Sequence, residues 1–228
     1  MWSRDCSHAA TLASQVGATT VDPLAALDCA VDFCIVAVSD DALPAVAAQL
    51  RMPDSIVVHT SGTCDLALLR DVSPRHGVLW SPISFVRQEA LDYATLPYCI
   101  EGSDAATTAA LEQLVGAVGT HIYQLDTAQR RHAHLSAVIA NNFGNALLAE
   151  VQRLTTQWNI PFELLQPIIM QTALRAGTGD LWQRQTGPAA RHDHSTLDTH
   201  RAMLQGQPEM LELYDLFTQL IMQNRTTP

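Results

Sequence analysis

Short runs of β-branched and apolar residues alternate with alanine- and leucine-rich stretches over the first half of the chain. Residues 32–38 form a continuous apolar run of strand length, which predicts a strand buried on both faces, and residues 55–59 are predicted to form a second buried strand. Further strands are predicted at residues 2–4, 18–21, 77–80, 98–100 and 121–125. This alternation is typical of βαβ units and predicts an α/β fold built on a parallel sheet.

Helical patterns separate these strands. Helices are predicted at residues 8–16, 42–50 and 107–115, with a short helix opened by Asp22-Pro23 and an irregular segment at 81–96. Asp5 or Ser7 can cap the first helix, and Gly17 ends it. Ser39-Asp40-Asp41 is expected to cap the second, because serine and aspartate are preferred at that position.

After Asp126 the apolar period changes from 2 to about 3.6 residues. Residues 127–158 keep helical spacing over about thirty residues, which is longer than a typical globular helix. Further amphipathic helices are predicted at 162–176 and 208–223, and a polar irregular segment at 177–199. We therefore predict an α/β domain over residues 1–125, followed by an all-α domain over residues 126–228.

No G-x-G-x-x-G sequence occurs anywhere in the chain. In a dinucleotide-binding fold this turn follows the first strand and seats the pyrophosphate at a helix N-terminus. The chain has no room before Trp2 for the strand, turn and helix that would carry it. The pattern therefore indicates a dinucleotide-binding fold that begins one strand and one helix late.

Composition narrows the possible functions. All 13 basic residues are arginines, so a Walker A loop, a Schiff-base lysine and a lysine general base are excluded. The net charge of −10 argues against binding to nucleic acids or anionic membranes, which requires basic surface. Five cysteines without a C-x-x-C pair, and no signal peptide or membrane-spanning run, favour a cytoplasmic protein with reduced thiols.

Candidate ligand-binding residues follow the predicted strands, because ligands of open parallel sheets bind beyond the carboxyl ends of the strands. Arg4 stands where an arginine accommodates the 2′-phosphate of NADP, although it could equally be a solvated surface residue. His59 ends a buried strand and is followed by two hydroxyl residues, Thr60 and Ser61, and by Gly62, which allows close approach of the backbone. A simple turn does not require this combination, so we favour a ligand-binding role for it. The cofactor-binding candidates are Ser3, Arg4, Val38, Ser39, Asp40, His59, Thr60, Ser61, Gly62 and Pro82.

The predicted long helix carries a second group of polar candidates. His134, Asn142 and Asn145 share one stripe of the helix, and Asn141 lies near it. Asparagines inside the apolar stretch 135–148 are costly unless they are hydrogen-bonded. They could form polar contacts between packed helices or a wall facing the substrate, and we favour the substrate wall.

A third group lies in the irregular segment. Arg191 could pair with Asp193 or bind a substrate carboxylate, and the sequence does not separate these possibilities. A metal site is suggested by His192, Asp193, His194 and His200, since imidazole and carboxylate suit zinc. Their spacing fits no common zinc motif, so we predict no metal.

Several motifs together resemble a known family. They are Val57-Val58-His59-Thr60-Ser61-Gly62, His76-Gly77-Val78-Leu79-Trp80-Ser81-Pro82, His132-Ala133-His134-Leu135-Ser136-Ala137-Val138-Ile139-Ala140-Asn141-Asn142-Phe143, Thr186-Gly187-Pro188-Ala189-Ala190-Arg191-His192-Asp193 and Leu213-Tyr214. In this order they are similar to Rossmann-like proteins whose C-terminal half is called domain of unknown function 2520, often labelled NADP oxidoreductases. The resemblance covers nearly the whole chain.

The resemblance implies an NADP-binding Rossmann domain joined to a helical domain like those of 6-phosphogluconate and β-hydroxyacid dehydrogenases. Those relatives use a lysine one turn before an asparagine of the first long helix. That position falls near Val138, and this chain has no lysine. His134, one turn earlier, is the nearest substitute general acid/base, with Asn141 and Asn142 beside it.

Family members also begin with a strand and a Gly-x-Gly-Asn turn, and the match here starts only at Trp2-Ser3-Arg4. About thirty residues of the family pattern, one βα unit, are missing. We therefore expect an in-frame continuation upstream of Met1 that encodes this unit. Residues 1–228 alone are expected to bind dinucleotide poorly and to be less stable, because a buried strand is left unpaired.

Three functional hypotheses follow. The first is an NADP-dependent oxidoreductase acting on a small carbonyl, alcohol or imine substrate, paired as a homodimer through its helical domain as such relatives usually are. The second is a non-catalytic binding or dimeric scaffold protein, favoured by the missing lysine and glycine-rich turn. The third is a histidine-based metal hydrolase, which requires bound zinc.

Overall fold

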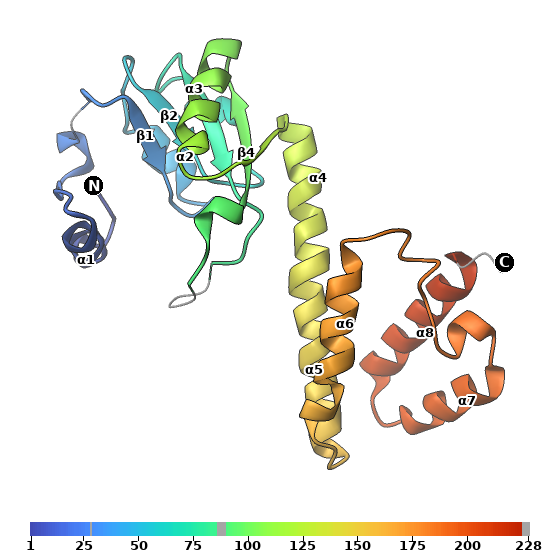
Figure 1. Cartoon of the computed structure of the whole chain (residues 1–228). Helices are drawn as coiled ribbons and strands as arrows, with labels where there is room; N and C mark the ends of the chain where they lie inside the picture. The colour runs from blue at the N-terminus through green and yellow to red at the C-terminus, as the bar shows by residue number, and fades with distance from the viewer. Residues whose placement is uncertain (28, 86–89, 225–228) are drawn as a thin grey trace. The chain divides into compact units, whose positions relative to one another are not determined.

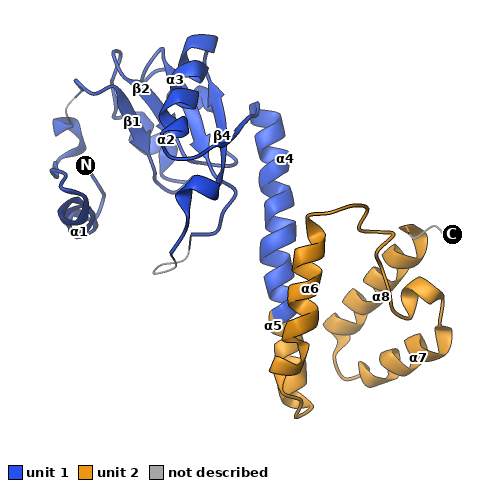
Figure 2. Ribbon diagram, viewed as in Figure 1, with its two compact units in different colours: residues 1–148 blue, residues 149–228 orange. Residues whose placement is uncertain are grey.

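The structure, a computed structural model, describes residues 1–27, 29–85 and 90–224 (Figure 1). Within the predicted irregular segment 81–96, residues 86–89 lie outside the described residues. The chain forms two compact units, residues 1–148 and 149–228 (Figure 2). Strands alternate with helices in the first unit, and the second contains only helices and loops among its described residues. The chain thus consists of an α/β unit followed by an α-helical unit.

The first unit is built on a five-stranded sheet of order β1-β2-β3-β4-β5. Its strands are β1 (Phe33–Val36), β2 (Ile56–His59), β3 (His76–Trp80), β4 (Pro97–Gly102) and β5 (His121–Gln124). All neighbouring strands are parallel except β3 and β4, which are antiparallel. A parallel crossover needs a connection of helical length, whereas the described part of the β3–β4 connection holds only η3 (Tyr93–Thr95). The sheet is therefore mostly, not wholly, parallel.

The strands predicted at residues 2–4 and 18–21 are not formed. The N-terminal ammonium donates to the Thr19 carbonyl at 2.8 Å, and the Val21 N–H donates to the Met1 carbonyl at 2.9 Å. These bonds join the two segments to each other and not to the sheet. Among the described residues, β1 pairs only with β2, and its Ile35 side chain is 52% exposed, although an apolar run predicted burial on both faces.

The helices of the first unit bear out one of their two predicted N-caps. They are α1 (Cys6–Val16), η1 (Leu24–Ala26), α2 (Leu43–Ala47), η2 (Leu66–Leu69) and α3 (Ala105–Gly116). Asp5 caps α1 by accepting from the Ser7 N–H, and Gly17 ends it in the left-handed region at φ 66°. The predicted side-chain cap of α2 is wrong. The Ser39 carbonyl accepts from the Ala42 N–H instead, which leaves the Asp40 carboxylate for another partner.

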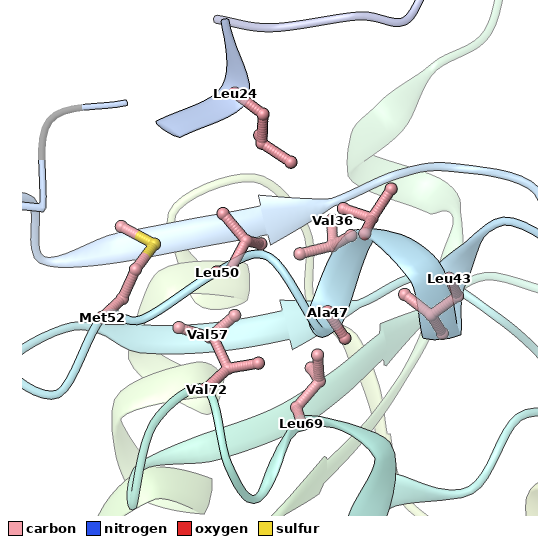
Figure 3. Packing of buried hydrophobic residues seen from close by; sticks show 10 residues of the cluster. Leu24, Val36, Leu43, Ala47, Leu50, Met52, Val57, Leu69 and Val72 are labelled. Carbon is pink, nitrogen blue, oxygen red and sulfur yellow. The ribbon is translucent and has the colours of Figure 1, made fainter. Parts of the chain in front are cut away.

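Helices cover both faces of the sheet because successive side chains of a strand point to opposite faces. Val57 of β2 packs into a cluster with Leu43 and Ala47 of α2, to which Leu24 of η1 and Leu69 of η2 contribute (Figure 3). The flanking residues of β2, Ile56 and Val58, pack instead with residues of α3. This two-sided core holds β2, and hence the loop that follows it, rigidly in the sheet.

The long helical run predicted from residue 127 is present. It consists of α4 (Thr127–Ala137), the π-helical segment η4 (Val138–Phe143) and α5 (Gly144–Gln157). Asp126 starts it with a capping box, accepting from the Gln129 N–H while the Gln129 side chain accepts from the Asp126 N–H. Helix α4 packs on the sheet through Ala133, which contacts the cluster of Val78 and Trp80.

The second unit is helical. Its described elements after α5 are η5 (Phe162–Leu165), α6 (Gln166–Ala176), η6 (Ala189–Arg191), α7 (His194–Met203) and α8 (Pro208–Asn224). The predicted irregular segment 177–199 is wrong at its end, because Asp193 caps α7 by accepting from the Thr196 N–H at 3.1 Å. Nowhere in 1–27, 29–85 or 90–224 is a helix long and apolar enough to cross a membrane.

Candidate functional site

Strands β1, β2 and β3 are parallel, so their carboxyl ends meet at one edge of the sheet. The residues that follow β2, 60–64, are called the β2 loop below. Thr63 of this loop donates its hydroxyl hydrogen to the Asp40 carboxylate at 2.6 Å. The structure thus joins the predicted strand end 39–41 to the residue that directly follows the predicted strand end 59–62.

The β2 loop is held by its own serine. The Ser61 Oγ accepts from the backbone N–H groups of Thr63 at 3.1 Å and Cys64 at 2.9 Å. Such a bond fixes the loop without help from other elements. The Ser61 hydroxyl, predicted to contact a cofactor, is therefore already engaged in shaping the loop, whereas Thr60 is partly exposed at its start.

His59 ends β2 and is fully buried. Its Nδ1 accepts from the Ser61 N–H at 3.2 Å, and its Nε2 has no hydrogen-bond partner among the described residues. Burial, together with the charge of Arg130, lowers the pKa of His59 to about 4, although nearby Asp40 and Asp65 act in the opposite direction. The ring is therefore neutral at physiological pH and supports the loop from inside.

A buried arginine that the sequence analysis did not single out connects this loop to the helix. Arg130 of α4 is 1% exposed and donates to the carbonyls of Ser61 at 3.0 Å and Cys64 at 2.9 Å. It also forms a salt bridge of 3.0 Å with Glu101 of β4, and Thr127 donates to the same carboxylate at 2.8 Å. The charge of Arg130 is thus balanced within the sheet.

The sheet register explains why this contact is possible. His59, Val78 and Glu101 lie side by side on β2, β3 and β4, so they share one face of the sheet. The clusters assign α4 to the same face through Ala133. The only sequence signal for Arg130 is its position one helical turn before His134, on the same helical stripe.

His134 reaches the β2 loop directly. Its ring lies 5.8 Å from the Trp80 ring, centroid to centroid, at an interplanar angle of 48°. A Cβ atom built on Gly62 would lie 2.5 Å from Cδ2 of His134 and 3.0 Å from the Trp80 ring. The glycine that the sequence analysis linked to a close backbone approach is therefore approached by His134, a residue of another candidate group.

The asparagines of the long helix lie on its exposed surface. Asn141 and Asn142 lie in the π-helical segment, Asn145 follows in α5, and all three are exposed. Leu135 and Ile139 are also exposed, by 55% and 52%. The predicted cost of burying amide groups therefore does not arise in this chain. A π-helical turn is itself frequent at functional sites, since it shifts side chains out of helical phase.

The remaining strand-end candidates differ in their exposure. Arg4 is exposed and directly precedes the Asp5 cap of α1, while Ser3 and Pro82 are partly buried. Val38 packs against the buried cluster between β2 and α2.

The candidates of the second unit form local contacts. Asp193 caps α7, and hydrogen bonds from Thr196 lower the pKa of its carboxyl group. Arg191 is exposed in η6, and His200 bonds the Tyr214 hydroxyl at 2.9 Å. Within the part of the chain that the structure describes, no three His, Cys, Asp or Glu side chains are grouped as a metal site would need.

Comparison with protein families settles the affiliation of the chain. Residues 96–221, more than half of the 228, match the family model described as a domain of unknown function, DUF2520. The chain belongs to the DUF2520 family. The matched region starts at β4 and includes Arg130 and His134. No curated protein matches this DUF2520 protein.

Solved structures resemble it over nearly its whole length. A candidate NADP oxidoreductase of Bacteroides fragilis, BF3122, is 29% identical with a TM-score of 0.84, covering 97% of this chain and 87% of its own. An imine reductase of Myxococcus stipitatus in complex with NADP+ is 15% identical with a TM-score of 0.62, covering 96% and 83%. A reductive aminase of Aspergillus terreus with NADPH and ethyl-5-oxohexanoate is 16% identical with a TM-score of 0.71, covering 96% and 82%. The last two show the shared fold.

Proposed function

We propose that this DUF2520 protein is an NADP-dependent oxidoreductase that reduces a small carbonyl or imine substrate, or oxidises the corresponding alcohol. The observation that carries the proposal is the contact of His134 with Gly62. It places an ionisable side chain of the helical run against the carboxyl end of a central parallel strand. Dinucleotides bind at such strand ends. The imine reductase and the reductive aminase that share the fold hold NADP+ and NADPH, respectively.

The residues proposed to hold the cofactor are those of the strand ends. Ser39 is exposed and Thr60 is partly exposed at that edge, and the exposed Arg4 is proposed to neutralise the 2′-phosphate. These features fit a dinucleotide, although no glycine-rich turn is present to seat the pyrophosphate. NADPH supplies the hydride when it is bound.

His134 is proposed as the general acid/base. It is half-buried, and an imidazole can donate a proton to the substrate oxygen or nitrogen as hydride arrives at the adjacent carbon. Asn141, Asn142 and Asn145 are proposed to line the substrate, because they are exposed on the continuation of the same helix. Arg191 and Asp193 remain proposed substrate contacts.

NADPH consumption with a panel of cyclic imines and small oxo acids tests this function. We expect turnover with at least one substrate, and a rate about a hundredfold lower in His134→Ala, which is the usual scale for a lost acid/base group. His132→Ala is the matched control, because His132 is exposed on the same helix and lies two residues away. An unchanged rate in His134→Ala would remove His134 from the mechanism.

A non-catalytic binding or scaffold role is the second candidate. It is favoured by the absence of any lysine and of a glycine-rich turn in the chain. Exposed apolar residues of α6, such as Ile168 and Leu174 at 61% and 77%, supply a surface for the proposed homodimer in either case. Titration of the protein into NADPH, followed by nucleotide fluorescence, separates the two. Saturable binding supports the oxidoreductase, even at the low affinity expected without a glycine-rich turn, and a complete absence of binding supports the scaffold.

A further inference from the structure

We infer that Arg130 is a positioning residue: it holds helix α4 on the β2 loop and thereby fixes His134 above Gly62. The inference rests on the proposed function, because it gives Arg130 a part in placing the proposed acid/base. Arg130 itself is only 1% exposed, and its guanidinium group is engaged by the carbonyls of Ser61 and Cys64 and by the Glu101 carboxylate. It therefore acts through another residue, and it is distinct from the groups proposed to meet substrate or cofactor.

Arg130 donates hydrogen bonds to residues on both sides of Gly62 in the β2 loop. Its Nη1 donates to the Ser61 carbonyl and its Nη2 donates to the Cys64 carbonyl. The next residue of the helix, Arg131, donates through Nε to the Thr63 carbonyl at 2.8 Å. Three carbonyl oxygens of the β2 loop thus accept from two adjacent arginines of α4. Such an arrangement fixes both the distance and the rotation of the helix relative to the loop.

His134 lies one helical turn beyond Arg130, on the same face of α4. The His134 ring has little freedom there. It lies so close to Gly62 that a methyl group on that residue would clash with it, and the Trp80 ring lies beside it. A small rotation or shift of α4 would consequently move the imidazole away from the strand end. Misplacement of a reacting group by about 1 Å can cost about a hundredfold in rate.

The guanidinium group is itself held from a third side. Its Nη2 lies 3.0 Å from the Glu101 carboxylate and 3.3 Å from the Thr127 hydroxyl. Only the planar fork of an arginine can reach two loop carbonyls and a carboxylate together, whereas a lysine ammonium is a single point charge. The contacts of Arg130 therefore tie the β2 loop, β4 and α4 into one support.

Arg130→Lys tests the inference by kinetics. We expect kcat for NADPH oxidation to fall about tenfold or more. In a His134→Ala background the same substitution should leave kcat almost unchanged, because the imidazole that Arg130 positions is absent. Arg70→Lys is the matched control, since Arg70 is exposed and donates only to Ala67 of its own turn among the described contacts. Equal losses in both backgrounds would overturn the inference.

A second readout does not need activity. The His134 ring protons lie beside the Trp80 indole, so their NMR shifts carry a ring-current contribution. Arg130→Lys should move these resonances, and unchanged resonances would overturn the inference. If Arg130→Lys does not fold, the double variant Arg130→Met with Glu101→Leu takes its place, because it removes the guanidinium without leaving the partner carboxylate uncompensated; it should move the same resonances, and unchanged resonances would again overturn the inference. A wild type without turnover refutes the proposed function alone, and the NMR result still decides the role of Arg130.

Discussion

The stability of this protein should depend on pH through one buried histidine. The pKa of His59 is lowered from 6.5 to about 4 in the folded chain, mainly by burial. Below pH 6.5 the unfolded chain takes up a proton that the folded chain refuses, so the free energy of unfolding falls as the pH falls. The loss levels off below pH 4. A difference of about 2.5 pKa units corresponds to about 3 kcal/mol at most.

His59→Asn isolates this contribution. The amide oxygen of asparagine can accept from the Ser61 N–H, as Nδ1 of His59 does, but the side chain does not titrate. We expect the wild type to lose about 2 kcal/mol more than the variant between pH 7 and pH 4.5, measured by urea unfolding followed by circular dichroism. The exposed His132→Asn variant should behave as the wild type does. Equal losses in wild type and His59→Asn would refute the reasoning.

Three further predictions concern packing and assembly. Arg130→Met should lower the free energy of unfolding by about 3–5 kcal/mol in denaturant titrations, because it leaves the mostly buried charge of Glu101 without its partner. Adding Glu101→Leu removes that charge and should recover part of the loss. Gly62→Ala should cost about 1–3 kcal/mol through its clash with His134, and a stability equal to wild type in thermal unfolding would contradict the observed contact. Ile168→Asp should weaken self-association in sedimentation velocity experiments, whereas an unchanged distribution would place the dimer contact elsewhere.

Local chemistry made much of the first unit predictable. The predicted strands at 32–38 and 55–59 contain β1 and β2, since short segments rich in β-branched residues favour strands over helices. Asp5 and Gly17 bound α1 through preferences that reside in single residues. The antiparallel β4 was not predictable, because strand direction depends on how the chain crosses the sheet and not on the strand's own residues.

The candidate site was predictable only in part for the same reason. His59, Gly62 and His134 carry visible signals, namely a polar strand end and a helical stripe. The contact between Gly62 and His134 arises because α4 lies on the sheet face that β2 and β4 share. It joins residues that are far apart in sequence, so local patterns do not predict it. Arg130 gave no signal of its own, because a buried arginine looks like a surface arginine until its partners are known. The left-handed His192 and the cap at Asp193, which start α7, were likewise hidden in a polar stretch.

The most direct test of the central claim follows hydride transfer itself. Reduction of a cyclic imine or oxo acid with NADPH that carries deuterium at both hydrogen positions of nicotinamide C4 would be analysed by mass spectrometry of the product, for the wild type and His134→Ala. We predict a product carrying one deuterium, formed about a hundredfold more slowly by the variant. A product without deuterium would contradict the oxidoreductase assignment, and equal rates would contradict the role of His134 at the end of β2.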